Sequence, residues 1–270
     1  MDRYAVLGNP VSHSLSPAIH ARFGEITGDP IDYRALEAPI GGFAVFAEAL
    51  FDSGMRGANV TLPFKVDAYE LAAVRSDRAA AAGAANFLAL RDGKIHADNT
   101  DGAGLVIDLE SNLGCAIEAG EILIVGAGGA SRGVVAPLLA RKPRRLVIAN
   151  RTADKARELA KHFASRGPVE GAALGSIPQA RFSIVINATS TSTKGEALAL
   201  PPAILEGALA YDMAYGAKAD SFLAGARAAG AARTSDGLGM LVEQAAESFA
   251  LWRGRRPPTS GVLEELRARR

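Results

Sequence analysis

Residues 121–133 place the strongest constraint on the fold of this chain. Residues 122–125 form a short apolar run rich in β-branched side chains, which is typical of a strand buried on both faces of a parallel sheet. Three glycines follow directly, and glycine lets the backbone turn tightly and approach a ligand where a Cβ would collide. The helix predicted at 132–139 would point its free N–H groups and positive dipole end at this turn. The segment therefore predicts a dinucleotide-binding turn.

Two departures from the usual G-x-G-x-x-G pattern leave a tight structural turn as the alternative. Gly126 and Gly128 match the pattern, but Ser131 occupies the position of its third glycine. Pro137 lies inside the predicted helix, where a kink is expected. A second buried strand at 145–149 follows at the spacing of a nucleotide-binding unit and favours the dinucleotide interpretation.

The end of this second strand predicts which cofactor binds. An NAD enzyme has Asp or Glu there, which accepts a hydrogen bond from the ribose 2′-hydroxyl. This chain has Asn150, Arg151 and Thr152 instead. Because an arginine pairs with the 2′-phosphate that a carboxylate would repel, we expect NADP. Lys155, one helical turn beyond Arg151, either adds a second positive charge or belongs to a solvated helix face.

Length and charge limit the class of protein. The 270 residues exceed the usual size of a single core, so two domains are expected. With 49% hydrophobic and 22% charged residues, the composition is ordinary for a soluble globular protein. A formal net charge of +1 provides no electrostatic reason to bind nucleic acid or a membrane. We therefore expect small molecules as partners.

Further features indicate the compartment. Cys115 is the single cysteine and cannot form an internal disulfide. The first ten residues lack the apolar core of a signal peptide, and no apolar run is long enough to span a bilayer. We expect a cytoplasmic protein. The four histidines are His13, His20, His96 and His162. Their spacing does not match that of metal ligands, so we expect no metal site.

The first hundred residues predict a second α/β unit. Apolar runs and helical patterns alternate, and the order strand, helix, strand implies parallel pairing. We expect strands at 4–7, 31–37 and 56–60 and helices at 16–27 and 42–53. A helical stretch to residue 83 precedes a hairpin with strands at 85–90 and 94–98, closed at Asp92-Gly93.

Polar residues stand at the carboxyl ends of these strands. Ser16 is the expected N-cap of its helix, and with Ser12, His13 and Ser14 it forms a corner that either only caps the helix or also binds a carboxylate. Lys65 is predicted in the first turn of a helix, where the dipole disfavours positive charge, so it is either an exposed lysine or a functional one. Asp101 precedes a helix predicted at 103–112 and is an N-cap in the alternative interpretation.

Taken together, these motifs resemble the shikimate dehydrogenase family. The matching segments are Ser-His-Ser-Leu-Ser-Pro at 12–17, Asn-Val-Thr-Leu-Pro-Phe-Lys at 59–65, Gly-Ala-Ala-Asn at 83–86, Asn-Thr-Asp-Gly at 99–102, the glycine turn, and Gly-Leu-Gly-Met-Leu-Val-x-Gln-Ala at 237–245. They follow the family's order and spacing along essentially the whole chain. One position departs from the family, since Phe87 follows Asn86 where the family usually has threonine.

The predicted elements imply an α/β fold with two α/β domains. We expect residues 1–101, completed by returning C-terminal helices at 238–270, to form a substrate-binding and catalytic domain. Residues 102–237 are expected to form a Rossmann-like, doubly wound domain that binds NADP. Both sheets carry polar groups at the carboxyl ends of parallel strands, so we predict the site in the cleft between the domains.

The resemblance implies the reversible, NADPH-dependent reduction of 3-dehydroshikimate to shikimate, a step of chorismate and aromatic amino acid biosynthesis. Hydride transfer to a ketone leaves negative charge on the carbonyl oxygen, so a proton donor must lie beside it. We predict Lys65 as the general acid and base. Asp101 beside it would favour the ammonium form of the lysine.

The resemblance also assigns binding residues by position. Those implied for the substrate are Ser14, Ser16, Thr61, Asn86, Asp101, Tyr215 and Gln244. Those implied for NADP are Gly126, Ala127, Gly128, Gly129, Ala130, Asn150, Arg151, Thr152, Lys155, Met213 and Gly237, and Asp77 either approaches the nicotinamide or is a solvated carboxylate.

Three other functions stay open. They are a quinate/shikimate dehydrogenase of dual specificity, a non-catalytic NADP-dependent sensor on the same fold, and a structural or interaction protein. The last of these leaves the polar groups at the strand ends unexplained. We expect either a monomer or a homodimer.

Overall fold

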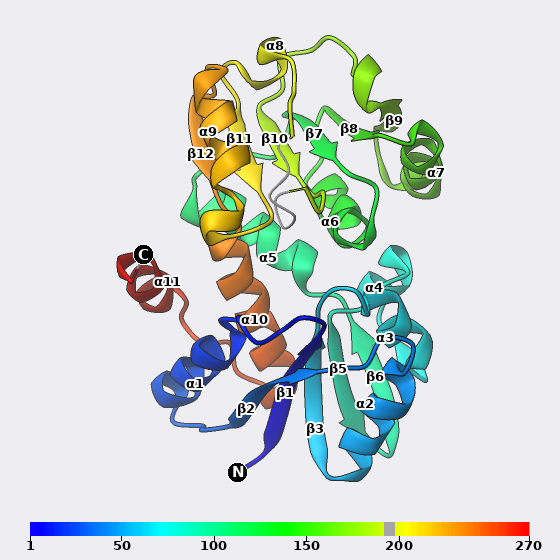
Figure 1. Ribbon diagram of the computed structural model, residues 1–270, viewed down its shortest axis with the longest axis vertical. Helices are drawn as coiled ribbons and strands as arrows, with labels where there is room; N and C mark the ends of the chain where they lie inside the picture. Colours follow the sequence, from blue (N-terminus) through cyan, green and yellow to red (C-terminus); the bar gives the residue numbers. More distant parts are fainter. Residues whose placement is uncertain (192–197, 270) are drawn as a thin grey trace. The chain divides into compact units, whose positions relative to one another are not determined.

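A computed structural model describes residues 1–191 and 198–269, and the chain divides into two compact units (Figure 1). Unit 1 consists of Met1–Gly104 and Leu241–Arg270, and unit 2 of Leu105–Met240. Each unit contains a six-stranded sheet. Among the described residues, none of the helices combines the length and apolarity needed to cross a bilayer.

The sheet of unit 1 is mixed, with strand order β2-β1-β3-β5-β6-β4. The parallel pairing predicted for its first three strands is confirmed, since β1 pairs with both β2 and β3 in parallel. The hairpin is also confirmed, and its turn residues Asp92 and Gly93 have φ angles of 49° and 70°, as a two-residue type I′ turn requires. The strands are β1 (Arg3–Gly8), β2 (Asp32–Glu37), β3 (Met55–Val60), β4 (Val74–Arg75), β5 (Phe87–Arg91) and β6 (Lys94–Asp98).

The helices of unit 1 correct some details of the prediction. The stretch expected to be helical up to residue 83 is interrupted by the short strand β4, which pairs with β6. Val45 shows that the apolar side chains of the helix predicted at 42–53 do not all face the core, since it is 74% exposed. The helices are α1 (Ser16–Thr27), α2 (Phe43–Asp52), α3 (Lys65–Leu71), α4 (Asp77–Ala82) and α11 (Ser260–Ala268), with α5 (Asp101–Ile107) beginning and α10 (Leu238–Arg253) ending in this unit.

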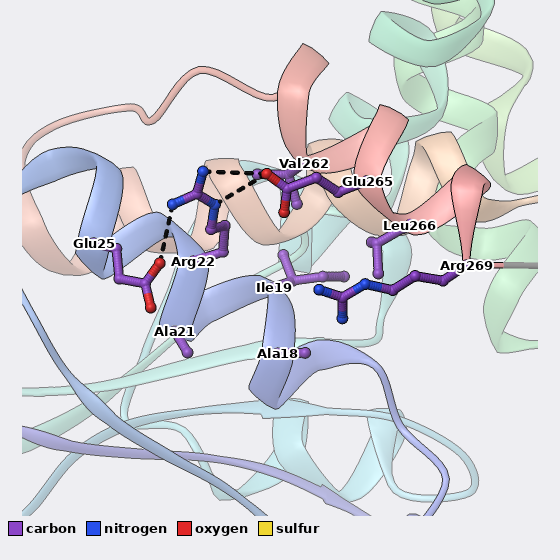
Figure 2. Close-up of a pocket in the computed structure, with 9 residues that line it drawn as sticks. All are labelled: Ala18, Ile19, Ala21, Arg22, Glu25, Val262, Glu265, Leu266 and Arg269. Carbon is purple, nitrogen blue, oxygen red and sulfur yellow. Dashed lines mark hydrogen bonds and ion pairs between the residues drawn. The ribbon is translucent and has the colours of Figure 1, made fainter.

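The C-terminal helix α11 packs on α1, and a shallow pocket lies between them (Figure 2). Arg22 of α1 forms ion pairs with Glu25 at 3.0 Å and with Glu265 of α11 at 3.1 Å. These charges are exposed, so the pairs are worth little on their own. The apolar side chains Ile19, Val262 and Leu266 supply most of the attachment, because all three are buried.

An aromatic cluster around Trp252 of α10 explains the departure from the family at Phe87. Phe87 is buried and stacks on Trp252, with the ring centroids 5.1 Å apart. Trp252 Nε1 donates a hydrogen bond to the carbonyl of Leu88 at 3.1 Å. The ring at position 87 therefore belongs to the core beneath the sheet.

His20 lies in the same cluster and is fully buried. Its ring stacks on Tyr33, with centroids 4.2 Å apart and planes 11° apart. Burial lowers the pKa of His20 to about 3, because neither buried ring nitrogen has a hydrogen-bond partner among the described residues that would offset the loss of solvation. At neutral pH His20 is therefore an uncharged core residue.

The sheet of unit 2 is entirely parallel, with strand order β12-β11-β10-β7-β8-β9. Residues 122–125 are all 0% exposed, which confirms that this strand is buried on both faces. The chain runs from β7 outward through β8 to β9, and then returns to the other side of β7 as β10, so the strand order reverses between β7 and β10. Ligands of doubly wound sheets bind at such a reversal.

Among the strands of unit 2 that were not predicted from the sequence are the short edge strand β12 and β9, whose residues Val-Glu-Gly-Ala-Ala lack a long apolar run. The strands are β7 (Glu121–Val125), β8 (Arg145–Asn150), β9 (Val169–Ala173), β10 (Ile184–Asn187), β11 (Leu209–Asp212) and β12 (Arg233–Ser235). The helices are α6 (Gly129–Ala140), α7 (Ala153–Phe163), α8 (Pro202–Leu205) and α9 (Asp220–Ala228), with a π-helical turn at Asp108–Asn112 after α5.

We predict that Gly57→Ala destabilises the protein. A Cβ at Gly57 would lie 2.2 Å from Trp252 Nε1 and 2.8 Å from the Leu88 carbonyl oxygen. Overpacking of this kind costs about 1–3 kcal/mol, so thermal denaturation should show a melting temperature lower by roughly 3–10 °C. Gly261→Ala in α11 is the control, since its Cβ would have no neighbour within 4 Å. Equal melting temperatures for the two variants would contradict the packing argument.

Candidate functional site

Lys65 and Asp101 form an ion pair in unit 1. Lys65 Nζ lies 2.5 Å from Asp101 Oδ2, and the two side chains are 15% and 7% exposed. Lys65 is the first residue of α3, as predicted, and Asp101 is the first residue of α5. The carboxylate offsets the unfavourable position of the ammonium at a helix N-terminus, and it gains from the positive dipole end of its own helix. The pair is therefore a partly shielded ammonium group held by its counter-ion, an arrangement that can donate a proton.

Asn86 connects this pair to α10. Its Nδ2 lies 2.8 Å from Asp101 Oδ1, 2.9 Å from Thr100 Oγ1 and 3.1 Å from Gln244 Oε1, and its Oδ1 accepts from the Thr100 backbone N–H at 2.7 Å. An amide has two N–H protons for these three acceptors, so acceptor capacity is left for the hydroxyl groups of a ligand. The structure thus brings four predicted residues into one network: Lys65, Asp101, Asn86 and Gln244.

The orientation of the Gln244 amide is fixed by the same bonds. Its Oε1 accepts from Asn86, and its Nε2 donates to the Leu241 carbonyl at 2.8 Å. The second proton of Nε2 is thereby left for another acceptor. Gln244 is 7% exposed, so it is not a solvated residue on the surface of α10.

A second row of buried polar groups supports the network and was not assigned to the site from the sequence. Asn59 Nδ2 donates to the Asn86 carbonyl at 3.1 Å and to Ser248 Oγ at 2.9 Å, and Asn59 Oδ1 accepts from Tyr33 Oη at 2.8 Å. Ser248 Oγ also lies 3.2 Å from Thr100 Oγ1. Asn59 is the first residue of the motif at 59–65 quoted above, whereas Ser248 lies one helical turn after Gln244 and belongs to none of the quoted motifs.

The serine corner differs from the prediction in its capping. Leu15 is the N-cap of α1, Ser16 is its first helical residue, and Ser14 Oγ accepts from the Ser16 backbone N–H at 3.2 Å. The prediction of Ser16 as the N-cap is therefore wrong. The side-chain oxygen that accepts from the first N–H of the helix comes from Ser14. Burial raises the pKa of the Tyr33 hydroxyl, and a hydrogen bond with Ser16 opposes the shift, which connects the serine corner to Asn59.

Thr61 lies at the end of β3, where its backbone N–H donates to the Leu7 carbonyl at 2.9 Å. Its methyl group fills the space beside Gly8, since a Cβ at Gly8 would lie 2.5 Å from Thr61 Cγ2. Asp77, the first residue of α4, is exposed in the same unit.

The glycine turn of unit 2 leaves open space at the start of a helix. Gly126 has a φ of 116°, and a Cβ there would lie 2.9 Å from the Ala188 carbonyl oxygen. A Cβ at Gly128 or Gly129 would have no neighbour within 4 Å. The helix begins at Gly129 and not at residue 132 as predicted, so the free N–H groups lie within the glycine turn itself.

Ser131, at the position of the third glycine, connects α6 to the glycine turn. It is fully buried, and its Oγ donates to the Gly126 carbonyl at 2.8 Å, which ties the helix to the turn. Pro137 lies inside α6, which continues to Ala140.

The basic residues predicted to select the cofactor stand at the end of the next strand. Asn150 is the last residue of β8, and its side-chain amide donates to the Thr152 carbonyl at 2.9 Å. Arg151, Thr152 and Lys155 are exposed there, at the N-terminus of α7. A helix N-terminus flanked by two cationic side chains provides a favourable place for a phosphate.

The remaining predicted residues of unit 2 lie beyond β11. Gly237 packs on Met213, since a Cβ at Gly237 would lie 2.4 Å from the Met213 carbonyl oxygen. The Gly237 N–H donates to the Ala214 carbonyl at 2.9 Å. Tyr215 follows in the same loop and is half-buried. Within the described residues, no group of three or more His, Cys, Asp or Glu side chains could hold a metal ion.

Family models match most of the chain. Residues 6–88 match the shikimate dehydrogenase substrate binding domain, residues 109–195 the shikimate/quinate 5-dehydrogenase model, and residues 237–267 the shikimate 5′-dehydrogenase C-terminal domain.

Curated relatives match over their whole length. The chain is 54% identical over 269 residues to the shikimate dehydrogenase (NADP(+)) of Dechloromonas aromatica, covering 99% of this chain and 98% of the relative. It is 52% identical over 268 residues to the protein of that name from Nitrosospira multiformis, with the same coverage.

Solved structures share the fold. An Ael1 enzyme from Pseudomonas putida superimposes with a TM-score of 0.92 at 44% identity, covering 98% of both chains. The shikimate 5-dehydrogenase of Thermus thermophilus in complex with NADP(H) and shikimate gives a TM-score of 0.86 at 33% identity, covering 99% of both chains. The whole-length identity, together with the buried lysine–aspartate pair and the glycine turn, places this chain in the shikimate dehydrogenase family.

Proposed function

We propose that this protein catalyses the reversible, NADPH-dependent reduction of 3-dehydroshikimate to shikimate. The observation that carries the proposal is the buried Lys65–Asp101 ion pair, joined through Asn86 to Gln244. Curated relatives about half identical to this chain bear the name shikimate dehydrogenase (NADP(+)). Unit 1 would bind the substrate and unit 2 the cofactor.

Lys65 acts as the general acid in the proposed reduction. When bound, NADPH supplies the hydride that the carbonyl carbon receives. Lys65 Nζ then gives a proton to the carbonyl oxygen as negative charge develops there, and in the reverse reaction it takes the proton back. Asp101 accepts a hydrogen bond from the Lys65 ammonium at 2.5 Å and thereby fixes its direction.

The other substrate residues follow from the kind of group each offers. Ser14 and Ser16 would hold the ring carboxylate at the N-terminus of α1, where an anion is favoured. Thr61, Asn86, Asp101 and Gln244 would hold the ring hydroxyls, and Tyr215 is the further residue that we assign to substrate binding.

Unit 2 fits NADP at two places. The open space at Gly128 and Gly129, next to the N-terminus of α6, would accept the pyrophosphate with Gly126, Ala127 and Ala130. Arg151 and Lys155, with Asn150 and Thr152, would bind the 2′-phosphate at the end of β8. Met213 and Gly237 would contact the remainder of the cofactor.

Quinate is the second candidate substrate. The model matched by residues 109–195 is described as shikimate/quinate 5-dehydrogenase, and two serines at the carboxylate corner fit either acid.

We place the enzyme in the cytoplasm. Its single cysteine, Cys115, is half-buried and forms no disulfide, which agrees with a reducing compartment.

We predict NADP-linked oxidation of shikimate at a higher kcat/KM than that of quinate, followed by NADPH absorbance. Both acids should be tested against NADP and NAD. Comparable kcat/KM values for the two acids would instead establish dual specificity. Binding of NADP without turnover of either acid would contradict the proposed enzymatic function and favour an NADP-dependent sensor.

We predict that Lys65→Ala lowers kcat by roughly 10²–10⁴ while KM changes little, because a general acid acts chiefly in the transition state. Steady-state kinetics with shikimate and NADP measure both constants. Lys94→Ala, in the exposed hairpin of the same unit, should leave them unchanged. Near-normal turnover in a folded Lys65→Ala variant would remove this residue from the proton transfer.

We predict that Arg151→Ala reduces the preference for NADP over NAD by roughly 10- to 100-fold, since a charge-assisted hydrogen bond contributes about 1.5–3 kcal/mol. The preference is the ratio of kcat/KM values for the two cofactors. Arg166→Ala, an exposed arginine after α7, should leave the ratio unchanged. A ratio that stays constant in Arg151→Ala would show that the 2′-phosphate binds elsewhere.

A further inference from the structure

We infer that Asp108 is a positioning residue that sets the nicotinamide end of the cofactor site in unit 2. This inference rests on the proposed NADP dependence. Asp108 carries no assigned role in the proposed reaction. It is nevertheless a fully buried carboxylate at the start of the π-helical turn Asp108–Asn112. Turns of this kind are rare and occur frequently at functional sites.

Several groups hold the Asp108 carboxylate in place. Tyr211 Oη donates to Oδ2 at 2.7 Å, and Asn112 Nδ2 donates to Oδ1 at 3.0 Å. On its third side the carboxylate fills the space beside Gly239, where an added Cβ would lie 1.9 Å from Oδ1. Gly239 belongs to the first turn of α10, whose positive dipole end favours a carboxylate. Since a buried charge is costly unless it is paired and hydrogen-bonded, this arrangement fixes the parts that surround it.

The parts that Asp108 joins are the end of β11 and the start of α10. Tyr211 is the penultimate residue of β11, two residues before Met213, and Gly239 is two residues after Gly237. Gly237 and Met213 are in turn in close backbone contact, with 2.4 Å between the Cβ position of Gly237 and the Met213 carbonyl oxygen. Asp108 therefore stabilises the contact between Met213 and Gly237, the two residues proposed to bind NADP.

A second carboxylate, that of Asp236, also joins the loop after β11 to the start of α10. Asp236 Oδ2 accepts from the Gly216 N–H at 2.9 Å, and its Oδ1 accepts from the Leu238 N–H at 3.2 Å. Two carboxylates, those of Asp108 and Asp236, thus hold the end of β11 and its following loop against the first turn of α10. Such fixing is expected where backbone atoms must meet a ligand with little tolerance.

The strand order indicates which end of the cofactor this junction meets. A dinucleotide lies across the point where the strand order reverses, here between β7 and β10. Arg151, at the end of β8, would bind the 2′-phosphate of the adenosine half on one side of that point. The nicotinamide half would then lie on the side of β10 and β11. Asp108 should therefore affect the nicotinamide half of NADP and leave the adenosine half unaffected.

We predict that Asp108→Asn weakens the binding of NADP⁺ by about 10-fold or more but changes the binding of adenosine 2′,5′-bisphosphate less than about 2-fold. Asparagine keeps the shape of the side chain but replaces one carboxylate oxygen by an N–H₂ group, which no longer accepts a hydrogen bond. Both ligands are titrated by calorimetry into the full-length protein without substrate. Tyr211→Phe, which removes only the hydroxyl, should weaken NADP⁺ selectively as well, and Asp220→Asn, an exposed acid in the first turn of α9, is the matched control.

The outcomes separate positioning from general stabilisation. Selective loss of NADP⁺ affinity in Asp108→Asn or in Tyr211→Phe supports the inference. Equal loss for both ligands would make Asp108 a purely structural residue and overturn it, as would unchanged NADP⁺ affinity in both variants. If the unaltered protein binds neither ligand, the proposed cofactor itself is wrong, which is a different result from normal binding with insensitive variants.

Discussion

The Lys65–Asp101 ion pair is the interaction on which the rest of unit 1 depends. A lysine at the first position of a helix is electrostatically unfavourable, and a mostly buried aspartate is costly without a partner. The carboxylate neutralises the lysine at the helix N-terminus, and the ammonium pairs with the buried aspartate. Both effects require that the carboxyl ends of β3 and β6 lie close together. The mixed sheet, in which β5 lies between these strands, supplies that arrangement. The chemistry proposed for Lys65 thus needs the same contact that makes its position tolerable.

Unit 2 solves a different problem, which is to bring backbone atoms close to an anionic ligand. Its contribution comes from absent side chains more than from present ones: a Cβ at Gly128 or Gly129 would enter open space, and a Cβ at Gly126 or Gly237 would collide with a backbone carbonyl of the same unit. Fully buried polar side chains hold the backbone around these positions, with Ser131 at the glycine turn and Asp108 beside α10. The first unit would therefore recognise its ligand through side chains and the second largely through backbone.

Local patterns in the sequence predicted what depends on neighbouring residues. The buried strand at 122–125, the Asp92-Gly93 turn, the parallel order of the first three strands and the placing of Lys65 in a first helical turn were all confirmed. Capping was predicted less well. The sequence does not show whether Ser14 or Ser16 caps the helix, because both carry a hydroxyl and only the backbone conformation distinguishes them. The edge strand β9 was missed, since its pairing with β8 compensates for weak local propensity.

The sequence by itself determined the two α/β units, the family and the identity of the groups that can do chemistry, because these follow from periodicity and from motifs of short span. Only the tertiary structure decided which groups touch. Asn86 bridges Asp101 and Gln244, Ser248 supports Thr100, and Asp108 meets Tyr211 across about a hundred residues of chain. Such pairs depend on burial and hydrogen-bond geometry between distant segments, and no local pattern encodes a partner that lies far away along the chain.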